Sequence, residues 1–167
     1  LLRTQGNVRI YSAGASEGQE LISAALLLAE SGALARSELL GVDCRRDAIE
    51  HARAARFAPD ALTGIDATLR GRYFRPAGGK WVLAPELKQA MRWRVADLIS
   101  FREAPAWDLI LFRNVAIYLN DQHATKAWRN LCEQLRPGGF MIAGTAERPP
   151  KELPLTRVGT AVFRKST

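Results

Sequence analysis

Two short stretches near the start of the chain have the residue types of a ligand site. The first, Gly14-Ala15-Ser16-Glu17-Gly18, separates an alternating apolar stretch from a segment rich in Leu and Ala. Small residues there let a ligand approach the backbone beside a helix N-terminus. Asp43 ends a second apolar stretch, where a carboxylate can accept hydrogen bonds from two ribose hydroxyls. The pair indicates a nucleoside cofactor, although a tight turn and a helix-capping acid would explain the same residues.

The spacing of the glycines narrows the class of cofactor. Dinucleotide-binding loops follow a G-x-G-x-x-G pattern, whereas here Ser16 lies midway between Gly14 and Gly18, and Leu21 stands where a third glycine would be. This departure disfavours a pyrophosphate and is compatible with an adenosyl cofactor without phosphates, such as S-adenosylmethionine. Asp97, just after a later strand, could then meet the edge of the adenine. Arg113-Asn114, after the next strand, would face the same cleft.

The elements that must position these residues alternate between strand and helix. Apolar and β-branched runs predict strands over 8–11, 38–43, 91–95, 107–112 and 139–143, and helical spacing predicts helices over 20–31, 46–56 and 121–135. Parallel strands joined by helices form an α/β sheet with right-handed crossovers. Residues 158–164 are expected to form a last, antiparallel strand. The candidate residues would share the carboxyl edge of this sheet.

The segment 64–94 interrupts the alternation. It contains several glycines and prolines, and two extended stretches, 72–75 and 80–83, flank Pro76-Ala77-Gly78-Gly79. This pattern is typical of a hairpin and its turn. We therefore predict a small β-subdomain over 64–94, inserted in a single domain that spans residues 1–167.

The charge of the chain is unevenly distributed. The net charge is +7; residues 61–94 contain 7 basic and 2 acidic side chains, and residues 148–167 contain 5 and 1. Such a local excess suits an acidic partner, and solvated surface arginine would explain it equally well. The composition, with 47% hydrophobic and 25% charged residues, is that of an ordinary globular domain.

The cysteines and the apolar runs indicate in which cellular compartment we expect the protein. Cys44 and Cys132 are the only cysteines, and they are read as reduced thiols of a cytoplasmic protein. Cys132 shares an apolar helical stripe with Trp128 and Leu131, which favours a core position over a reactive one. The longest apolar run, Leu21–Ala29, is far shorter than the roughly 20 residues of a membrane span. We predict neither membrane insertion nor a metal ion.

A series of motifs resembles those of the CheR-type chemotaxis receptor methyltransferases. In chain order they are Tyr11–Glu20, Val42-Asp43, Ala96–Leu98, Phe112–Tyr118, Leu135–Gly139 and Ala143–Glu147. The resemblance covers residues 8–163 and is most specific at Arg113-Asn114-Val115-Ala116-Ile117-Tyr118. It implies a Rossmann-like class I methyltransferase domain with an inserted β-subdomain. It further implies S-adenosylmethionine as cofactor, S-adenosylhomocysteine as product, and methylation of glutamate side chains on receptor cytoplasmic helices.

The resemblance also implies roles for individual residues. The implied cofactor-binding residues are Ala13, Gly14, Ala15, Ser16, Glu20, Asp43, Cys44, Asp97, Leu98, Asn114 and Val115. At the methyl-transfer site, Arg113 would attract the acceptor carboxylate and Tyr118 would border the acceptor channel, unless Tyr118 is only an amphipathic wall residue. The substrate brings an ionised nucleophile, so no protein base is demanded, and His51 and His123 need no role.

The chain also departs from the family pattern. The family's Asp-x-Asp after the second strand is Asp43-Cys44-Arg45 here, and its usual asparagine after the third strand is Asp97. The chain begins just before the first predicted strand, so we expect the family's N-terminal helical domain to be absent and the chain alone to be a poor methyltransferase. The short connection 76–79 disfavours docking on a receptor tail peptide.

The partner is expected to be acidic. Chemoreceptor cytoplasmic helices, or another acidic protein surface, would suit the basic residues Arg70, Arg72, Arg75, Lys80, Arg92 and Arg94. A non-catalytic relative that binds S-adenosylmethionine, its demethylated product or a protein remains an alternative. A nucleic-acid methyltransferase is the least favoured, because Arg113-Asn114-Val115 replaces the Pro-Pro-aromatic turn that base methylation generally uses.

Overall fold

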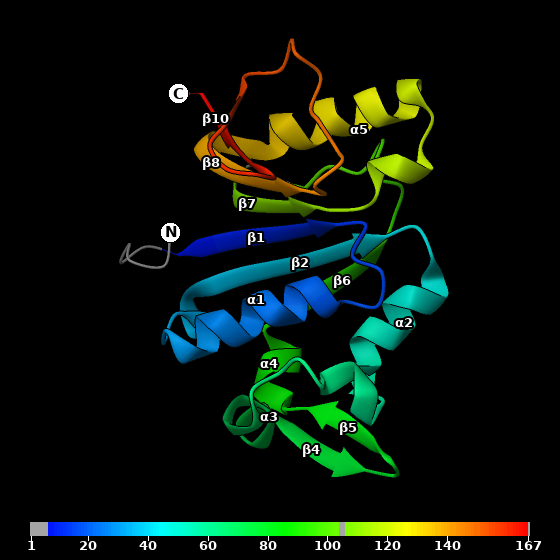
Figure 1. Ribbon diagram of the computed structural model, residues 1–167, viewed down its shortest axis with the longest axis vertical. Coiled ribbons are helices and arrows are strands. Elements are labelled where there is room, and N and C mark those ends of the chain that lie inside the picture. Colours follow the sequence, from blue (N-terminus) through cyan, green and yellow to red (C-terminus); the bar gives the residue numbers. More distant parts are fainter. Residues whose placement is uncertain (1–6, 104–105, 167) are drawn as a thin grey trace.

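A computed structural model describes residues 7–103 and 106–166, which form one large sheet and one small one. The large sheet has seven strands in the order β6-β2-β1-β7-β8-β10-β9 (Figure 1). Their bounds are β1 Val8–Ala13, β2 Ser37–Asp43, β6 Met91–Val95, β7 Trp107–Phe112, β8 Leu135–Ala143, β9 Leu155–Arg157 and β10 Val162–Lys165. The first five in spatial order are parallel, and β10 is antiparallel to β8 and β9. The predicted mostly parallel sheet with a final antiparallel strand is confirmed; β9 was not predicted.

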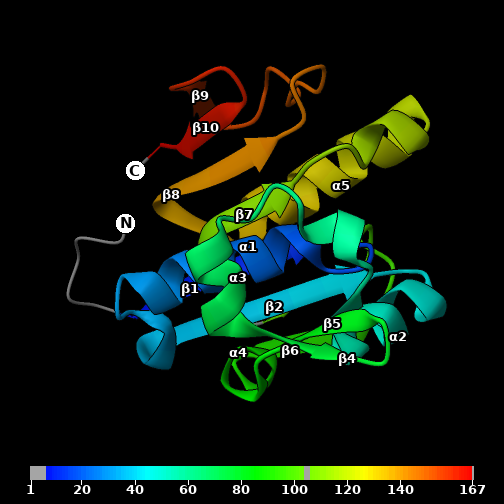
Figure 2. The same ribbon diagram turned by 60° about the horizontal axis from the view of Figure 1, so that its bottom comes forward.

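Helices cover both faces of the large sheet. They are α1 Gln19–Glu30, α2 Arg46–Ala54, α3 Ala67–Tyr73, α4 Pro85–Gln89 and α5 Asp121–Gln134, with short 3-10 turns η1 Leu34–Arg36, η2 Pro59–Leu62 and η3 Ala116–Tyr118. Ile10 and Tyr11 of β1 enter different cores, because successive side chains point to opposite faces of a strand. The core of Ile10 includes residues of α1 and α2, and that of Tyr11 residues of α5, so these helices lie on opposite faces (Figures 1 and 2). Within the described part of the chain, none of the helices has the length and apolarity needed to cross a bilayer.

Aromatic packing fixes α5 on the sheet. The Trp128 ring meets Phe112 of β7 and Phe163 of β10 edge to face, with ring centroids 5.1 and 6.2 Å apart. Cys132 on the same helix is 3% exposed, as its apolar stripe predicts, and burial raises the pKa of its thiol. The end of β7, which directly precedes Arg113, is thereby packed against α5.

The small sheet has three strands in the order β3-β5-β4, namely β3 Arg56–Phe57, β4 Phe74–Ala77 and β5 Lys80–Leu83. The predicted hairpin is present as the β4–β5 pair. Its surroundings differ from the predicted range 64–94 at both ends: the small sheet starts at β3, and Met91–Val95 pairs with β2 as an edge strand of the large sheet. A two-residue strand such as β3 has no periodicity by which a sequence could reveal it.

Candidate functional site

Five parallel strands end at one edge of the large sheet, and the loops that follow four of them enclose a cleft of about 640 Å³. The cleft is lined by Gly14, Ala15, Ser16, Gln19, Glu20, Asp43, Cys44, Arg45, Asp97, Leu98, Ile99, Arg113, Asn114, Val115, Tyr118 and Leu119. All the predicted site residues except Ala13 are among them. Its volume lies within the range of about 300–1,000 Å³ common for small-molecule sites.

Ala13 is the one residue predicted to bind the cofactor that does not line the cleft. Its side chain is 1% exposed and packs in the same core as Tyr11. The two residues are two apart on β1, so their side chains point to the same face of the sheet. Ala13 therefore supports the loop from below, and direct contact of its side chain with a ligand is not expected.

The first loop owes its glycines to close packing as well as to ligand access. Gly14 and Gly18 have φ angles of 74° and 90°, a region that side chains disfavour. A Cβ on Gly14 would lie 2.4 Å from Val115 Cγ2, and a Cβ on Gly18 would lie 2.5 Å from Trp93 Cη2. Both distances are shorter than atoms allow. Gly14 thus lets the first loop touch the loop after β7, which brings the two sides of the cleft together.

Asp43 joins the first and second loops. Its Oδ2 accepts a hydrogen bond of 2.8 Å from the Ser16 N–H, and its Oδ1 accepts one of 2.9 Å from the Arg45 N–H. An ionised carboxylate has about four acceptor positions, so each oxygen keeps capacity for a ligand hydroxyl. The carboxylate is held in one orientation at the end of β2, and this orientation suits it to bind the two hydroxyls of a ribose.

Arg45 was not predicted as a site residue, yet it lines the cleft beside Asp43. Its Nε lies 3.6 Å from Asp43 Oδ1, and its Nη2 donates a hydrogen bond of 3.0 Å to Ser16 Oγ. The guanidinium therefore spans the first and second loops, and Asp43 offsets its charge. A cation at this end of the cleft is consequently less repulsive to a sulfonium than an unpaired arginine would be.

Buried amides on α5 hold the loop that carries Asp97. Asn130 Nδ2 donates to the carbonyl oxygens of Leu98 and Phe101 at 2.7 and 2.8 Å, and Gln134 Nε2 reaches the Phe101 oxygen at 3.2 Å. Asp97 itself is exposed, and its Oδ1 accepts from the Ile99 N–H at 2.9 Å. The loop thus presents the Asp97 carboxylate to the cleft, and the amides on α5 hold its backbone in place.

Arg113 and Glu20 form an ion pair inside the cleft, with 2.7 Å between Nη1 and Oε1. Burial raises the pKa of Glu20, the charge of Glu147 adds to that rise, and the cation of Arg113 opposes it. Tyr118 is 83% exposed at the same cleft. The ion pair places a cation and an anion next to each other where an acceptor and a cofactor would meet.

Glu147 is a residue to which the sequence assigned no role. Glu147 is 5% exposed, and its carboxylate accepts backbone hydrogen bonds from the loop after β7. The available signal was its place in the motif Ala143–Glu147, but its partners lie about thirty residues earlier in the chain, and no local spacing reveals such a contact.

The residues around the cleft fit an adenosyl cofactor. A carboxylate lies at the end of β2, a second acid follows β6, and a glycine turn leaves the backbone accessible at Gly14. Among the described residues, no group of three or more His, Cys, Asp and Glu side chains could hold a metal ion. The carboxylates and the glycine turn of the cleft suit an organic ligand that carries a ribose.

Several curated proteins similar to this chain are named chemotaxis protein methyltransferases. A chemotaxis protein methyltransferase of Listeria innocua is 26% identical over 145 residues, which are 87% of this chain and 55% of that protein. One of Vibrio parahaemolyticus is 28% identical over 148 residues, 84% of this chain and 54% of that protein. The chain spans about half the length of these curated relatives.

The fold and the family agree. The crystal structure of the N-methyltransferase NodS from Bradyrhizobium japonicum, in complex with S-adenosylhomocysteine, covers 81% of this chain and 51% of its own, with 19% identity and a TM-score of 0.51. This likeness confirms the predicted Rossmann-like methyltransferase fold. The family model described as "CheR methyltransferase, SAM binding domain" matches residues 2–160. The predicted family and the predicted cofactor, S-adenosylmethionine, are thereby confirmed, and the chain belongs to the CheR methyltransferases as their S-adenosylmethionine-binding domain.

Proposed function

We propose that this chain transfers a methyl group from S-adenosylmethionine to glutamate carboxylates on the cytoplasmic helices of chemoreceptors. The observation that carries the proposal is the Arg113–Glu20 pair, 2.7 Å apart, in a cleft that Asp43 and Gly14 also line. Arg113 uses one of its five N–H donors on Glu20, so others can bind an acceptor carboxylate. The names of the relatives, which are chemotaxis protein methyltransferases, support methyl transfer within chemotaxis.

The residues of the cleft divide between cofactor and acceptor. Asp43 would bind the ribose hydroxyls, Asp97 the edge of the adenine, and Asn114 would shape the pocket between them. Arg113 would orient the acceptor carboxylate, and the exposed ring of Tyr118 would border its path. This division leaves the reacting atoms between the first loop and the loop after β7.

The reaction depends on alignment of the acceptor oxygen with the methyl carbon more than on proton transfer. Bound S-adenosylmethionine supplies an electrophilic methyl carbon, so the acceptor oxygen forms its bond to that carbon while the carbon–sulfur bond breaks and its electron pair stays on sulfur. Arg113 orients the attacking oxygen and so raises the fraction of productive encounters. His51 and His123 are exposed on helices and do not line the cleft, so the proposal gives them no role.

The acidic partner remains part of the proposal, with a smaller surface than predicted. Arg72 is paired with Glu30 at 2.6 Å, and Arg92 bridges Glu38 and Glu103. Arg75 Nη1 donates to backbone carbonyls, at 2.7 Å to that of Gly71. Within residues 56–90, six basic and three acidic side chains leave a net charge of +3. Lys80 on the β4–β5 hairpin is exposed, which supports contact of this hairpin with an acidic helix.

The test is a methylation assay with labelled S-adenosylmethionine and receptor cytoplasmic fragments. We expect label in carboxyl methyl esters, which alkali releases as methanol, at glutamates identified by mass spectrometry. Fragments in which those glutamates are replaced by alanine provide the control. Arg113→Ala should lower the incorporation more than it lowers affinity for S-adenosylhomocysteine. Alkali-stable label, or label on lysine or nucleic acid, would overturn the proposal.

A further inference from the structure

The loop after β7 carries five cleft residues and has little regular structure. The cleft is lined by Arg113, Asn114, Val115, Tyr118 and Leu119, and the helical part of the loop is the short turn η3. Asn114 has a φ of 57°, a conformation that is strained for a residue with a side chain. It turns the chain so that successive backbone N–H groups converge on one point. Buried N–H groups of this kind need an acceptor.

The side chain of Glu147 is that acceptor. Its Oε1 accepts from the N–H groups of Val115 and Ala116 at 2.9 and 2.7 Å. Its Oε2 accepts from the N–H groups of Asn114 and Gly144 at 2.9 and 2.6 Å. Hydrogen bonds to an ionised acceptor are about twice as strong as neutral ones. One carboxylate therefore holds three consecutive residues of the loop and ties them to the turn after β8.

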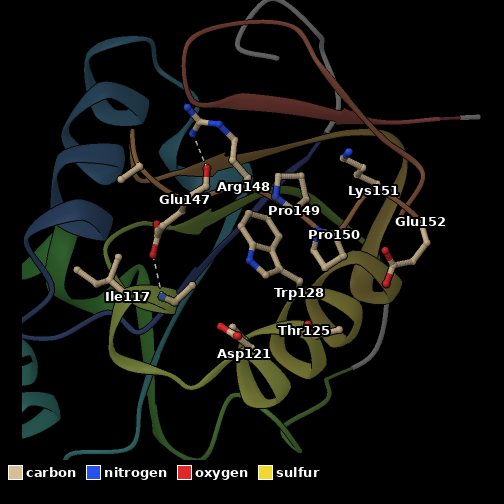
Figure 3. A pocket seen from close by; sticks show the side chains of 13 residues that line it. Ile117, Asp121, Thr125, Trp128, Glu147, Arg148, Pro149, Pro150, Lys151 and Glu152 are labelled. Atoms are coloured by element: carbon tan, nitrogen blue, oxygen red, sulfur yellow. Dashed lines mark hydrogen bonds between the residues drawn. The ribbon is translucent and has the colours of Figure 1, made fainter.

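Glu147 acts from the side of the loop that faces away from the cofactor cleft. It is absent from the lining of that cleft and lines a second cavity, of about 520 Å³, together with Ala116, Ile117 and Trp128. Figure 3 shows its carboxylate pointing toward the loop of Ile117, with the indole of Trp128 across the cavity. Besides its charge, which acts on Glu20 through space, Glu147 can influence methyl transfer through the backbone that it holds.

We propose that Glu147 is a positioning residue for methyl transfer, which sets the loop of Arg113 and Tyr118 in its reactive geometry by accepting four backbone hydrogen bonds. The proposal rests on the proposed function for what the loop does, whereas the hydrogen-bonded clamp stands independently of it. A displacement of about 1 Å in such a loop can cost on the order of a hundredfold in rate.

A carboxylate is needed because all four partners are donors. Glutamine has nearly the same shape, but one of its two terminal groups is an NH₂ donor. In Glu147→Gln this group would face either Val115 and Ala116 or Asn114 and Gly144. Two hydrogen bonds would be lost, and two N–H groups would be left against another donor. The isosteric substitution is thus a specific probe of the clamp.

The experiment compares the parent chain with Glu147→Gln in three measurements. Hydrogen exchange at the Asn114, Val115 and Ala116 amides should be faster by about tenfold or more, while exchange at the Ser16 amide, bonded to Asp43, should not change. Affinity for S-adenosylhomocysteine, by calorimetry, should fall about tenfold or less. With receptor fragments, kcat should fall further than this affinity, because alignment matters most in the transition state.

The matched control is Glu152→Gln. Glu152 lines the same second cavity, carries the same charge, and is bound to Arg129 at 2.9 Å on the surface. We expect this variant to keep the loop exchange rates, the cofactor affinity and kcat of the parent. Gly144→Ala is a second probe that keeps the carboxylate, because its Cβ would lie 2.6 Å from Glu147 Oε2 and displace it. It should show smaller changes in the same direction as Glu147→Gln.

Several results would overturn the inference. One is a cooperatively folded Glu147→Gln chain whose loop exchange, cofactor affinity and kcat stay within about twofold of the parent. If both variants unfold, hydrogen exchange in the parent chain tests the inference instead. Loop amides that exchange as fast as those of an unfolded chain, while the sheet amides are protected, would contradict the clamp. A parent chain that methylates no receptor fragment would overturn the proposed function instead, and the exchange and binding measurements would still test Glu147.

Discussion

At the scale of single residues, Asp43 combines a structural and a binding task. Its oxygens accept the N–H groups of Ser16 and Arg45, which orients the carboxylate at the edge of the sheet, 7% exposed. A residue that is held so firmly before any ligand arrives loses little side-chain entropy on binding. If Asp43 binds the ribose as we propose, the orientation set by the protein backbone contributes to its affinity.

Substitution of Asp43 tests this assignment. In Asp43→Asn one oxygen becomes an NH₂ donor, so the bidentate, charged contact with the ribose is lost. We expect affinity for S-adenosylhomocysteine to fall about ten- to a hundredfold, measured by calorimetry on folded protein. Asp47→Asn, an exposed acid on α2 that does not line the cleft, is the control. Equal affinity of Asp43→Asn and the parent would show that the ribose binds elsewhere.

The raised pKa of Glu20 predicts that its ionised form lowers the stability of the fold in a pH-dependent way. Burial raises its pKa in the fold, so folding favours the protonated acid and the ionised form is destabilising at neutral pH. Glu20→Gln should therefore unfold at higher urea concentration than the parent at pH 7. The gain should shrink as the pH falls below the ordinary pKa of glutamate, where both states of the parent are protonated.

Glu38 is expected to have the opposite effect on stability at pH 7. Hydrogen bonds from Arg9, followed by the charges of Arg9 and Arg92, lower the pKa of Glu38. Its contribution to stability is therefore present above the unfolded pKa and lost as the pH falls through the folded one. Glu38→Gln should lower stability at pH 7 and matter less in acid. If Glu20→Gln and Glu38→Gln both raised stability at pH 7, or both lowered it, this account would be wrong.

At the scale of elements, the site is a meeting of loops that separate parts of the chain hold in place. The amides of Asn130 and Gln134 on α5 fix the loop of Asp97, and Glu147 after β8 fixes the loop of Asn114. Gly14 permits the contact between the first loop and Val115. Each cleft loop thus depends on a neighbouring element for its conformation.

The small sheet is the element to which we assign the acidic partner. Lys80→Glu reverses one charge on its hairpin without removing an ion pair that the structure shows. We expect slower association with receptor fragments and a flatter dependence on salt, with affinity for S-adenosylhomocysteine unchanged. Lys126→Glu on the exposed face of α5 makes the same charge change far from the hairpin in the sequence. Equal effects of the two substitutions on association would remove the hairpin from the interface.

At the scale of the whole molecule, the cleft is open to solvent beside Tyr118. This residue lines the cleft and is 83% exposed. The curated relatives are nearly twice as long as the matched part, so they contain further segments that could cover such a surface. Water that reaches the site weakens the electrostatic and positional contributions to catalysis.

We therefore expect this 167-residue chain on its own to be a slow methyltransferase that nevertheless binds the cofactor. In the labelled-methyl assay its kcat should lie well below about 1 per second, the low end of typical enzymes. Calorimetry with S-adenosylhomocysteine shows in parallel whether the cofactor pocket is intact. A kcat at or above that value would mean that the cleft needs no cover.

The amino-acid sequence alone was enough for the order of the main strands, for the loop at Gly14, and for the acids Asp43 and Asp97 at the ends of strands. These features depend on local periodicity and on residue types near one another in the chain, and both are legible without a structure. The motif that contains Arg113 and Tyr118 likewise lies within a few residues.

The tertiary structure decided what depends on contacts between distant segments. Only there does Arg72 meet Glu30, does Met91–Val95 become an edge strand beside β2, and does the side chain of Ala13 turn into the core. The clamp of Glu147 on Asn114 spans 33 positions of the chain. Such contacts form because the packing of the whole core brings these loops together. No short stretch of sequence contains the information about that packing.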